Sequence, residues 1–400
     1  MARLDSRLKV LSIFGTRPEA IKMAPLLKAL EAEPGIDSQV CITGQHQHML
    51  KQVLELFDIQ ADYILNVMTP EQNLNTLTAS LYAAIDPVLE QARPDRVLVH
   101  GDTTSAMVAA MSAFHRRISV GHVEAGLRTG DIRQPWPEEM NRRCIDLICD
   151  QLFTPTAQAQ RNILGEHLQG TSFVTGNTVI DALQMTALRI SQNDQLRAAL
   201  DQQFSFLLAR RKILLVTGHR RENFGKGFLD ICQALRTLAR RDDLQIVYPV
   251  HLNPNVRGPV NEHLSGLANV HLIEPLDYLA FVRLMQLAHV VLTDSGGVQE
   301  EAPSLGKPVL VMRDVTERPE ALAAGTVRLV GTHPASIVQG VSALFDDERQ
   351  WRSASHASNP YGDGKACARI VDALMGRPVD EFVAAPQQQP IAIRTASSGH

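Results

Sequence analysis

Short apolar runs that alternate with helix-like stretches constrain the fold of this chain more than any other feature. The run LKVLSIFGT leads into PEAIKMAPLLKALEAE, where apolar positions recur at helical spacing, and RVLVHG leads into a predicted helix over Ser105–His115. Further helices are predicted from about His46 to Phe57, through Thr76–Gln91 and near Glu138–Asp150. This alternation is typical of a parallel, doubly wound sheet. Strands this continuously apolar predict helices on both faces of the sheet.

The alternation breaks at FVTGNTVIDALQ and restarts after a polar helical stretch that ends near Arg211. Six more strand-like runs follow: KILLVTGH, LQIVYPVH, VHLIEPL, HVVLTDS, KPVLVM and TVRLVG. A chain of 400 residues is long enough for two domains. We therefore expect two α/β domains joined near Gly176–Asp181. The expected division is 1–176 for the first domain, closed by a helix at about 359–376, 177–358 for the second, and 377–400 for a polar, disordered tail.

Composition excludes several classes of protein. The hydrophobic fraction of 44% and the charged fraction of 20% are ordinary for a globular chain. A net charge of −4 gives no general attraction to nucleic acid or to an anionic membrane. The five cysteines are an odd number without a C-x-x-C pair, which favours a cytoplasmic chain with reduced thiols. We see neither a membrane span nor a secretory leader.

Charged side chains stand where several apolar runs stop. VLVHGDTTS ends in Asp102, VGHVEAGLRT in Glu124, and ILLVTGHRREN in His219, while PWPEEMNR supplies Glu138. Ligands of parallel sheets bind outside the carboxyl ends of the strands. Convergence of these groups there predicts acid/base chemistry on an anionic substrate.

Each motif also has a simpler interpretation. Asp102 or a neighbouring threonine could merely cap a helix. Spacing does not choose between Glu138 and Glu139. His219 taken alone suits a structural role, but the arginines that follow it favour a phosphate site.

The run DSGGVQEEAPSLGKPVLV is the most specific of these motifs. Ser295, Gly296 and Gly297 would let backbone N–H groups approach an anion at a helix N-terminus. One turn later Glu301 could accept hydrogen bonds from a ribose diol, and Arg318 offers a positive charge. The run is neither the phosphate loop of nucleotide triphosphatases nor the dinucleotide fingerprint. In TGQHQHM the two histidines lack a third clustered ligand, so no metal site is predicted.

Many motifs together resemble one enzyme family, the bacterial non-hydrolysing UDP-N-acetylglucosamine 2-epimerases. The resemblance runs from about residue 8 to about residue 376. It is carried by FGTRPEAIKMAP, HGDTTS, GHVEAGLRTGD, PWPEEMNR, TGNTVIDAL, TGHRREN, YPVHLNPNVR, LTDSGGVQEEAPSLGKPVLVMRD, TERPEA and NPYGDGKAC. It implies two Rossmann-like domains in the GT-B arrangement with the active site in the interdomain cleft. It further implies interconversion of UDP-N-acetylglucosamine and UDP-N-acetylmannosamine without metal or nicotinamide, in a homodimer that serves polysaccharide synthesis.

The resemblance also assigns roles to residues. Asp102, Glu124, Glu138 and His219 fall on catalytic positions. Arg17 and Lys22 would reach the diphosphate or sugar, Ser295, Gly296 and Gly297 the phosphate, Glu301 the ribose, Phe281 the uracil and Arg318 further parts of the substrate. Leu276 falls at a uracil-edge position and offers only its backbone there. An activating second UDP-N-acetylglucosamine is expected near Gln45, His48, Arg220 and His251.

The chemistry explains why such groups are needed. No carbonyl acidifies the hydrogen on C2, and the missing dinucleotide fingerprint disfavours oxidation at C3. Expulsion of UDP from C1 would acidify C2–H, and a carboxylate could then form a 2-acetamidoglucal. Return of the proton on the opposite face gives the epimer, with Gly176–Asp181 as the expected hinge of closure. The alternatives are a GT-B glycosyltransferase, a hydrolysing epimerase and a nucleotide-sugar sensor without turnover.

Overall fold

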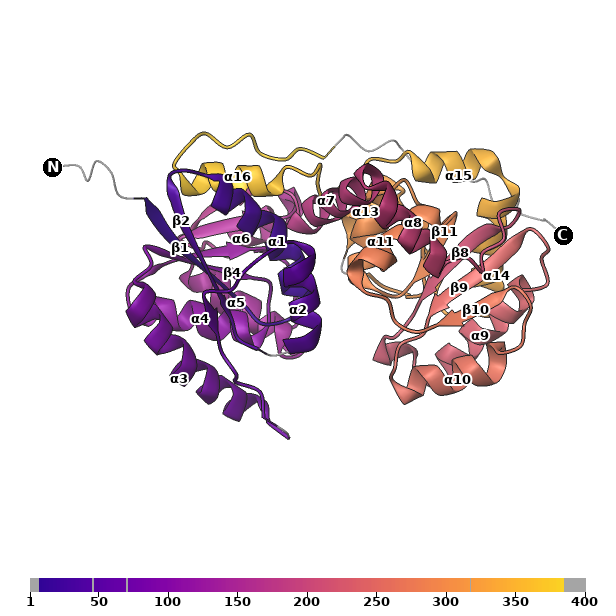
Figure 1. Cartoon of the computed structure of the whole chain (residues 1–400), viewed down its shortest axis with the longest axis horizontal. Coiled ribbons are helices and arrows are strands. Elements are labelled where there is room, and N and C mark those ends of the chain that lie inside the picture. The colour runs from indigo at the N-terminus through magenta and orange to yellow at the C-terminus, as the bar shows by residue number, and fades with distance from the viewer. Residues whose placement is uncertain (1–6, 45–46, 70, 317, 385–400) are drawn as a thin grey trace. The chain divides into compact units, whose positions relative to one another are not determined.

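The computed structural model describes residues 7–44, 47–69, 71–316 and 318–384, and these fall into two compact units (Figure 1). Unit 1 comprises the described residues up to Ala198 together with Asp277–Val282 and Tyr361–Val383. Unit 2 comprises Ala199–Leu276 and Arg283–Pro360. The domain boundary expected at residue 176 stays a prediction.

Unit 1 contains a parallel sheet whose seven described strands have the order β3-β2-β1-β4-β5-β6-β7. The order reverses direction between β1 and β4, which makes that pair the topological switch point. The strands are β1 (Leu8–Phe14), β2 (Ile36–Ile42), β3 (Tyr63–Ile64), β4 (Arg96–His100), β5 (Ser119–Val123), β6 (Gln151–Thr154) and β7 (Thr171–Val174).

Helices cover both faces of this sheet, as Figure 1 shows. One layer contains α3, α4 and α5, while α1 packs against α2, α7 and α16 in the other layer. The indigo α1 and the yellow α16 are thus neighbours although they come from opposite ends of the chain. The bounds are α1 (Arg17–Ala32), α2 (Gln47–Leu56), α3 (Leu74–Ala92), α4 (Thr104–His115), α5 (Glu138–Ile148), α6 (Ala157–Gly165), α7 (Thr178–Gln192) and α16 (Ala366–Leu374).

Unit 2 repeats the architecture with a six-stranded parallel sheet of order β10-β9-β8-β11-β12-β13. Its switch point lies between β8 and β11. The strands are β8 (Lys212–Thr217), β9 (Leu244–Pro249), β10 (Val270–Ile273), β11 (Val290–Thr293), β12 (Val309–Val311) and β13 (Val327–Leu329). The remaining helices are α8 (Asp194–Gln203), the short 3₁₀ helix η1 (Arg221–Asn223), α9 (Lys226–Leu238), α10 (Pro254–Leu264), α11 (Tyr278–Leu287), α12 (Gly296–Ser304), α13 (Pro319–Ala324), α14 (Pro334–Asp346) and α15 (Glu348–Ser355).

The prediction of two doubly wound α/β sheets is confirmed, and each of the six runs after the break forms a strand. The sequence did not indicate β3 and β7, which are the two edges of the first sheet. An edge strand needs no continuous apolar run. Accordingly only the last residue of β7 is buried, and β3 has only two residues. No described helix is long and apolar enough to cross a membrane.

A buried carboxylate joins the C-terminal segment to unit 1. Asp181 in the first turn of α7 accepts hydrogen bonds from the backbone N–H groups of Ala366 and Cys367, at 3.2 and 2.9 Å. These groups open α16, so Asp181 caps a helix that lies far away in the sequence. Further along, Phe382 is buried and donates its N–H to the Val174 carbonyl at 2.7 Å.

We therefore predict that Asp181→Ala lowers the free energy of unfolding by about 1–3 kcal/mol, because two buried N–H groups lose their acceptor. Urea denaturation followed by circular dichroism measures the change. Asp194→Ala is the control, since that side chain is 85% exposed and pairs only with Arg197 in its own helix. Equal stability of the two variants would contradict the capping role.

Candidate functional site

The carboxyl edge of the first sheet brings Asp102 and Glu124 to neighbouring strands. β4 and β5 pair so that His100 lies opposite Val123, and each strand is followed directly by a turn. At the first turn the side chain of Thr103, not Asp102, accepts the N–H of Ala106 at 3.0 Å. The helix cap is therefore the neighbouring threonine, as the simpler interpretation allowed, and the Asp102 carboxylate is directed to another partner.

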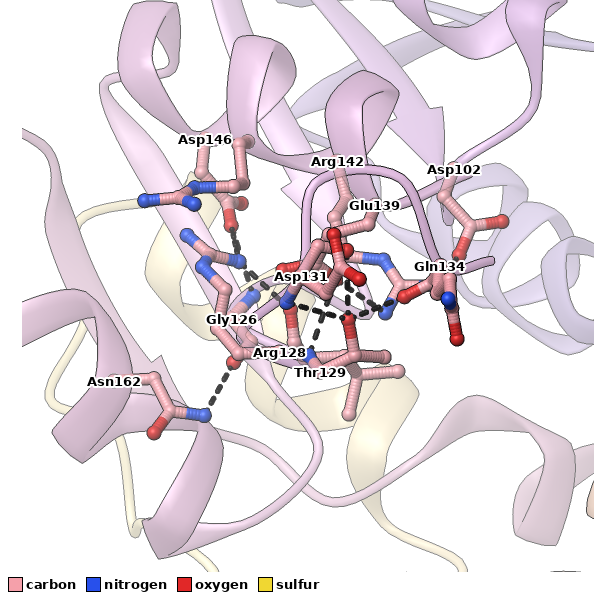
Figure 2. A network of polar contacts seen from close by, with 12 residues as sticks. Asp102, Gly126, Arg128, Thr129, Asp131, Gln134, Glu139, Arg142, Asp146 and Asn162 are labelled. Atoms are coloured by element: carbon pink, nitrogen blue, oxygen red, sulfur yellow. Dashed lines mark hydrogen bonds and ion pairs between the residues drawn. The ribbon is translucent and has the colours of Figure 1, made fainter. Parts of the chain in front are cut away.

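That partner is Arg142, which links two carboxylates. Figure 2 shows its guanidinium lying between Asp102 and Glu139. One nitrogen donates to Asp102, and another donates to Glu139 at 3.2 Å. The amide of Asn141 donates to the Asp102 carbonyl at 2.9 Å, so α5 holds both the side chain and the backbone of Asp102. No sequence motif indicated this contact.

The two candidate glutamates at the start of α5 differ in their surroundings. Glu139 is fully buried and accepts hydrogen bonds from the Thr129 backbone N–H, at 3.2 Å, and from Arg142. Oε2 of Glu138 and Oε1 of Glu139 are both buried without a hydrogen-bond partner among the described residues. The other oxygen of Glu139 holds the loop before α5, so the two glutamates differ in that contact and in burial, and not in the presence of an unpaired oxygen.

Glu124 is held in a strained backbone conformation by several polar contacts. Its φ of 69° lies in the left-handed region, which costs a non-glycine residue about 1–3 kcal/mol. Oε2 accepts hydrogen bonds from Lys22 Nζ and from Asn177 Nδ2, the latter at 2.9 Å, and lies 3.7 Å from His100 Nε2. The side chain is only 10% exposed. The sequence predicted Lys22 and Glu124 as site residues but gave no indication that they meet.

A deeper ionic network supports this edge. His122 places Nδ1 at 2.6 Å from Asp146 Oδ1 and Nε2 at 2.7 Å from the Gly101 carbonyl. The ring therefore contacts the network through both of its nitrogens. Burial alone would raise the pKa of Asp146, but His122 and Arg128 outweigh it and lower that pKa. Arg128 joins Asp146 to Glu166 (Figure 2 shows its contact with Asp146), and the network thereby fixes the peptide next to Asp102.

The start of α1 is tied to the same edge. Glu19 Oε2 accepts the N–H groups of Gly15 and Thr16, at 3.0 and 2.7 Å, in a capping box with Thr16. Glu19 Oε1 also accepts the hydroxyl of Thr103, at 2.6 Å, and this bond joins α1 to the loop of Asp102. Burial raises the pKa of Glu19, although these hydrogen bonds act against it. Arg17, the first residue of α1, is therefore held at the edge that carries Asp102.

In unit 2 a buried aspartate organises the turn after β8. Asp294 accepts hydrogen bonds from the N–H groups of His219 and Arg220, both at 2.9 Å, and from the Asn223 amide at 3.2 Å. The His219 ring stacks on His251, with centroids 5.3 Å apart. Burial lowers the pKa of His219 below its ordinary value, Asp294 raises it, and His251 and Arg220 lower it further.

The glycine turn after β11 has a clear steric reason. A Cβ atom on Gly296 would lie 2.7 Å from an Arg318 guanidinium nitrogen, so only glycine lets that cation rest against the start of α12. Nε of Arg318 donates to Glu300 at 2.6 Å, which orients the guanidinium. Ser295 is the N-cap residue of α12, but its side chain makes no capping hydrogen bond. Backbone N–H groups and a guanidinium at one helix start suit a phosphate.

The remaining predicted residues are less informative. Glu301 is buried one turn into α12, and Phe281 lies half-buried on α11, just after the half-buried Leu276. His48 lies on α2, and Gln45 lies outside the described residues. Among the described residues, no group of three or more histidine, cysteine, aspartate or glutamate side chains is arranged to hold a metal ion.

The carboxyl edge of one Rossmann-like sheet carries acid/base groups, and that of the other carries an anion-binding turn. This combination is typical of an α/β enzyme that binds a nucleotide. Comparison with known proteins identifies the family within this class. A family model described as UDP-N-acetylglucosamine 2-epimerase matches residues 28–375. The chain belongs to this family of isomerases.

Individual relatives are close over most of their length. The UDP-N-acetylglucosamine 2-epimerase of Salmonella typhimurium is 56% identical and aligns with 92% of this chain and 98% of its own. The enzyme of Escherichia coli K12 is 55% identical with the same coverage. A crystal structure of UDP-GlcNAc 2-epimerase from Neisseria meningitidis bound to UDP-GlcNAc is 48% identical, with a TM-score of 0.87 over 92% of this chain and 100% of that one.

The burial and the charged neighbours of His219 predict a lowered pKa for its imidazole. In the ligand-free enzyme we expect an NMR titration midpoint below the ordinary 6.5, so that the ring is neutral at pH 7. Asp294→Asn removes a negative charge that favours the protonated ring, and we expect the midpoint to fall further. Histidines that keep their midpoints serve as internal controls. A midpoint that rises in the variant would contradict the assigned contact.

Proposed function

We propose that this enzyme interconverts UDP-N-acetylglucosamine and UDP-N-acetylmannosamine by elimination and re-addition of UDP. The observation that carries the proposal is the grouping of Asp102 and Glu124 on adjacent strand ends, each carboxylate contacted by a cation. Family membership and the relative of known structure that binds UDP-GlcNAc support the choice of substrate. The glycosyltransferase and sensor alternatives are not favoured, since the family is one of epimerases.

In the proposed reaction the C1–O bond breaks first, and its electron pair leaves with the β-phosphate of UDP. The oxocarbenium-like centre that remains acidifies the hydrogen on C2, and a carboxylate removes it as a proton to form the 2-acetamidoglucal. A proton then reaches C2 from the opposite face while the UDP oxygen returns to C1. Asp102, Glu124 and Glu138 are the proposed acid/base groups, with the division of roles between them left open.

The leaving diphosphate needs positive charge and N–H groups. We assign these to Arg17 of unit 1 and to His219, Arg318 and the Ser295-Gly296-Gly297 turn of unit 2. His219 is neutral at pH 7 when the site is empty, because burial outweighs the pull of Asp294. An arriving diphosphate would favour its protonated form, so the cation forms where negative charge develops.

The rest of the substrate is assigned by residue type. Glu301, buried in α12, would accept the ribose hydroxyls, Phe281 would stack on the uracil, and Leu276 would offer its backbone. Lys22 would reach the sugar or diphosphate from its place beside Glu124. Arg220 and His251 flank His219 and are proposed, with His48 and Gln45, for a second activating UDP-N-acetylglucosamine.

Incubation with UDP-N-acetylglucosamine in D₂O, without an acceptor, tests the reaction. We expect deuterium at C2 in both UDP-sugars and scrambling of an isotope placed in the bridging C1–O–P oxygen. Free N-acetylmannosamine would indicate a hydrolysing enzyme. Turnover that requires an acceptor and leaves C2 without deuterium would indicate a transferase. UDP-sugar without deuterium at C2 after long incubation would contradict the elimination mechanism.

Asp102→Asn and Glu124→Gln should each bind UDP-sugar but lose turnover by about 10²–10⁴-fold, because neither amide exchanges a proton with carbon. Calorimetry measures binding, and the D₂O exchange measures turnover. Asp95→Asn is the matched control for Asp102. That residue directly precedes β4 at the opposite end of the strand, where it only accepts the Lys9 N–H at 2.9 Å. Normal turnover in both test variants would exclude these carboxylates from the mechanism.

We also propose that the enzyme is a cytoplasmic homodimer that supplies polysaccharide synthesis. Its five cysteines fit a reducing compartment. Light scattering at micromolar concentration should return twice the 44.0 kDa chain mass, and a stable mass of one chain would refute the dimer.

A further inference from the structure

His100 is a buried histidine that the reaction scheme does not use. It is the last residue of β4, only 3% exposed, two residues before Asp102. Neither ring nitrogen has a hydrogen-bond partner among the described residues. An unsatisfied buried polar group destabilises a fold, so two such groups on one imidazole call for a reason.

The direction of the ring supplies that reason. Nε2 lies 3.7 Å from Glu124 Oε2, slightly beyond hydrogen-bond distance. The charged and titratable groups that face His100 are Glu124 and His122 from the β5 segment and Lys22 from α1. Burial, Lys22 and His122 lower the pKa of His100 to about 3 and outweigh the opposing effect of Glu124. The imidazole is therefore neutral and keeps a nitrogen lone pair at neutral pH.

A lone pair beside Glu124 can accept a hydrogen bond from its protonated carboxyl group. The contacts of its Oε2 include two donors, the Lys22 ammonium and the Asn177 amide, and both stabilise the ionised carboxylate. When the carboxylate takes the proton from C2, its new O–H becomes a donor. An ammonium has no lone pair to accept that hydrogen bond, and an amide nitrogen is no acceptor. Neither of these two donors can accept that bond, whereas the neutral imidazole of His100 can.

We propose that His100 is a positioning residue for epimerisation, whose Nε2 accepts a hydrogen bond from protonated Glu124. The proton removed from C2 stays on Glu124, because the neutral ring is too weak a base to take it. The ring carries its own hydrogen on Nδ1. A small rotation of either side chain closes the present gap, and the bond breaks when Glu124 returns its proton. This inference rests on the proposed acid/base role of Glu124.

Two variants of His100 separate the presence of an acceptor from the filling of space. His100→Leu fills the site without a lone pair, and we expect kcat to fall by about 10–100-fold with KM within about threefold of wild type. His100→Gln places an amide oxygen near the former Nε2 and should restore kcat to within about fivefold. Thermal unfolding of each variant shows that loss of activity is not loss of fold.

The pH profile gives a readout that packing alone would not move. Glu124 must be ionised to remove the proton, so activity falls on the acidic side as Glu124 becomes protonated. Without an acceptor the protonated form is less stable, and in His100→Leu the acidic limb of kcat should move to lower pH by about one unit, a tenfold change in proton affinity. His100→Gln should keep the limb near that of wild type.

His289→Leu is the matched control. That histidine also has a buried ring nitrogen without a hydrogen-bond partner, and burial lowers its pKa to about 4. It precedes β11 at the amino end of the strand and stacks on Trp351, so it lies at the edge of the sheet opposite the anion-binding turn. We expect kcat and the acidic limb to remain unchanged.

Several outcomes would overturn the inference. One is a kcat of His100→Leu within twofold of wild type, and another is His100→Gln as impaired as His100→Leu. A third is an acidic limb of His100→Leu that stays in place or moves to higher pH. Movement to higher pH would show that His100 donates a hydrogen bond to Glu124 instead of accepting one. Glu124→Gln distinguishes the two proposals. If that variant still exchanges deuterium at C2, the role of Glu124 fails. If it does not exchange but His100→Leu is normal, only the role of His100 fails.

Discussion

In a parallel sheet the carboxyl ends of all strands lie at the same edge, and the chemistry of this protein depends on that constraint. Each strand must turn there to enter a helix, and the turn residues of paired strands become neighbours. The pairing of His100 with Val123 thus brings Asp102 near Glu124, and the pairing of Thr217 with Thr293 brings Asp294 under the turn of His219. Sheet register therefore selects which residues meet.

The carboxylates at these edges are buried or half-buried, and their partners decide whether that burial is tolerable. An isolated ion in a protein interior costs several kcal/mol, so each buried carboxylate needs donors in good geometry. Arg142 serves Asp102 and Glu139, while His122 and Arg128 serve Asp146. The second network touches no proposed acid/base carboxylate directly. It acts through the Gly101 carbonyl and the Gly126 N–H, and it thereby fixes the backbone that carries the reacting groups.

Much of the fold and part of the site could be predicted from local sequence. Apolar runs identify strands because a sheet covered on both faces buries every residue, and charged residues after such runs identify the edge. The edge strands escaped prediction because they are half-exposed or very short. The site contacts depend on tertiary packing that no local pattern encodes. Asn177 illustrates this: its Oδ1 makes the local cap of α7 at 3.0 Å, while its Nδ2 reaches Glu124 on a distant segment.

An acid/base carboxylate must be tolerated in two protonation states, and this requirement distinguishes it from a structural ion. Asp146 is contacted by His122 on one oxygen and by Arg128 on the other, and these contacts lower its pKa and favour the ionised form. Glu124 differs because a neutral imidazole lies beside its donors. Glu138 and Glu139 differ because each has one buried oxygen without a hydrogen-bond partner in the described part of the chain. Surroundings of this mixed kind cost stability in the empty protein. They are justified physically when a proton must arrive and leave within one catalytic cycle.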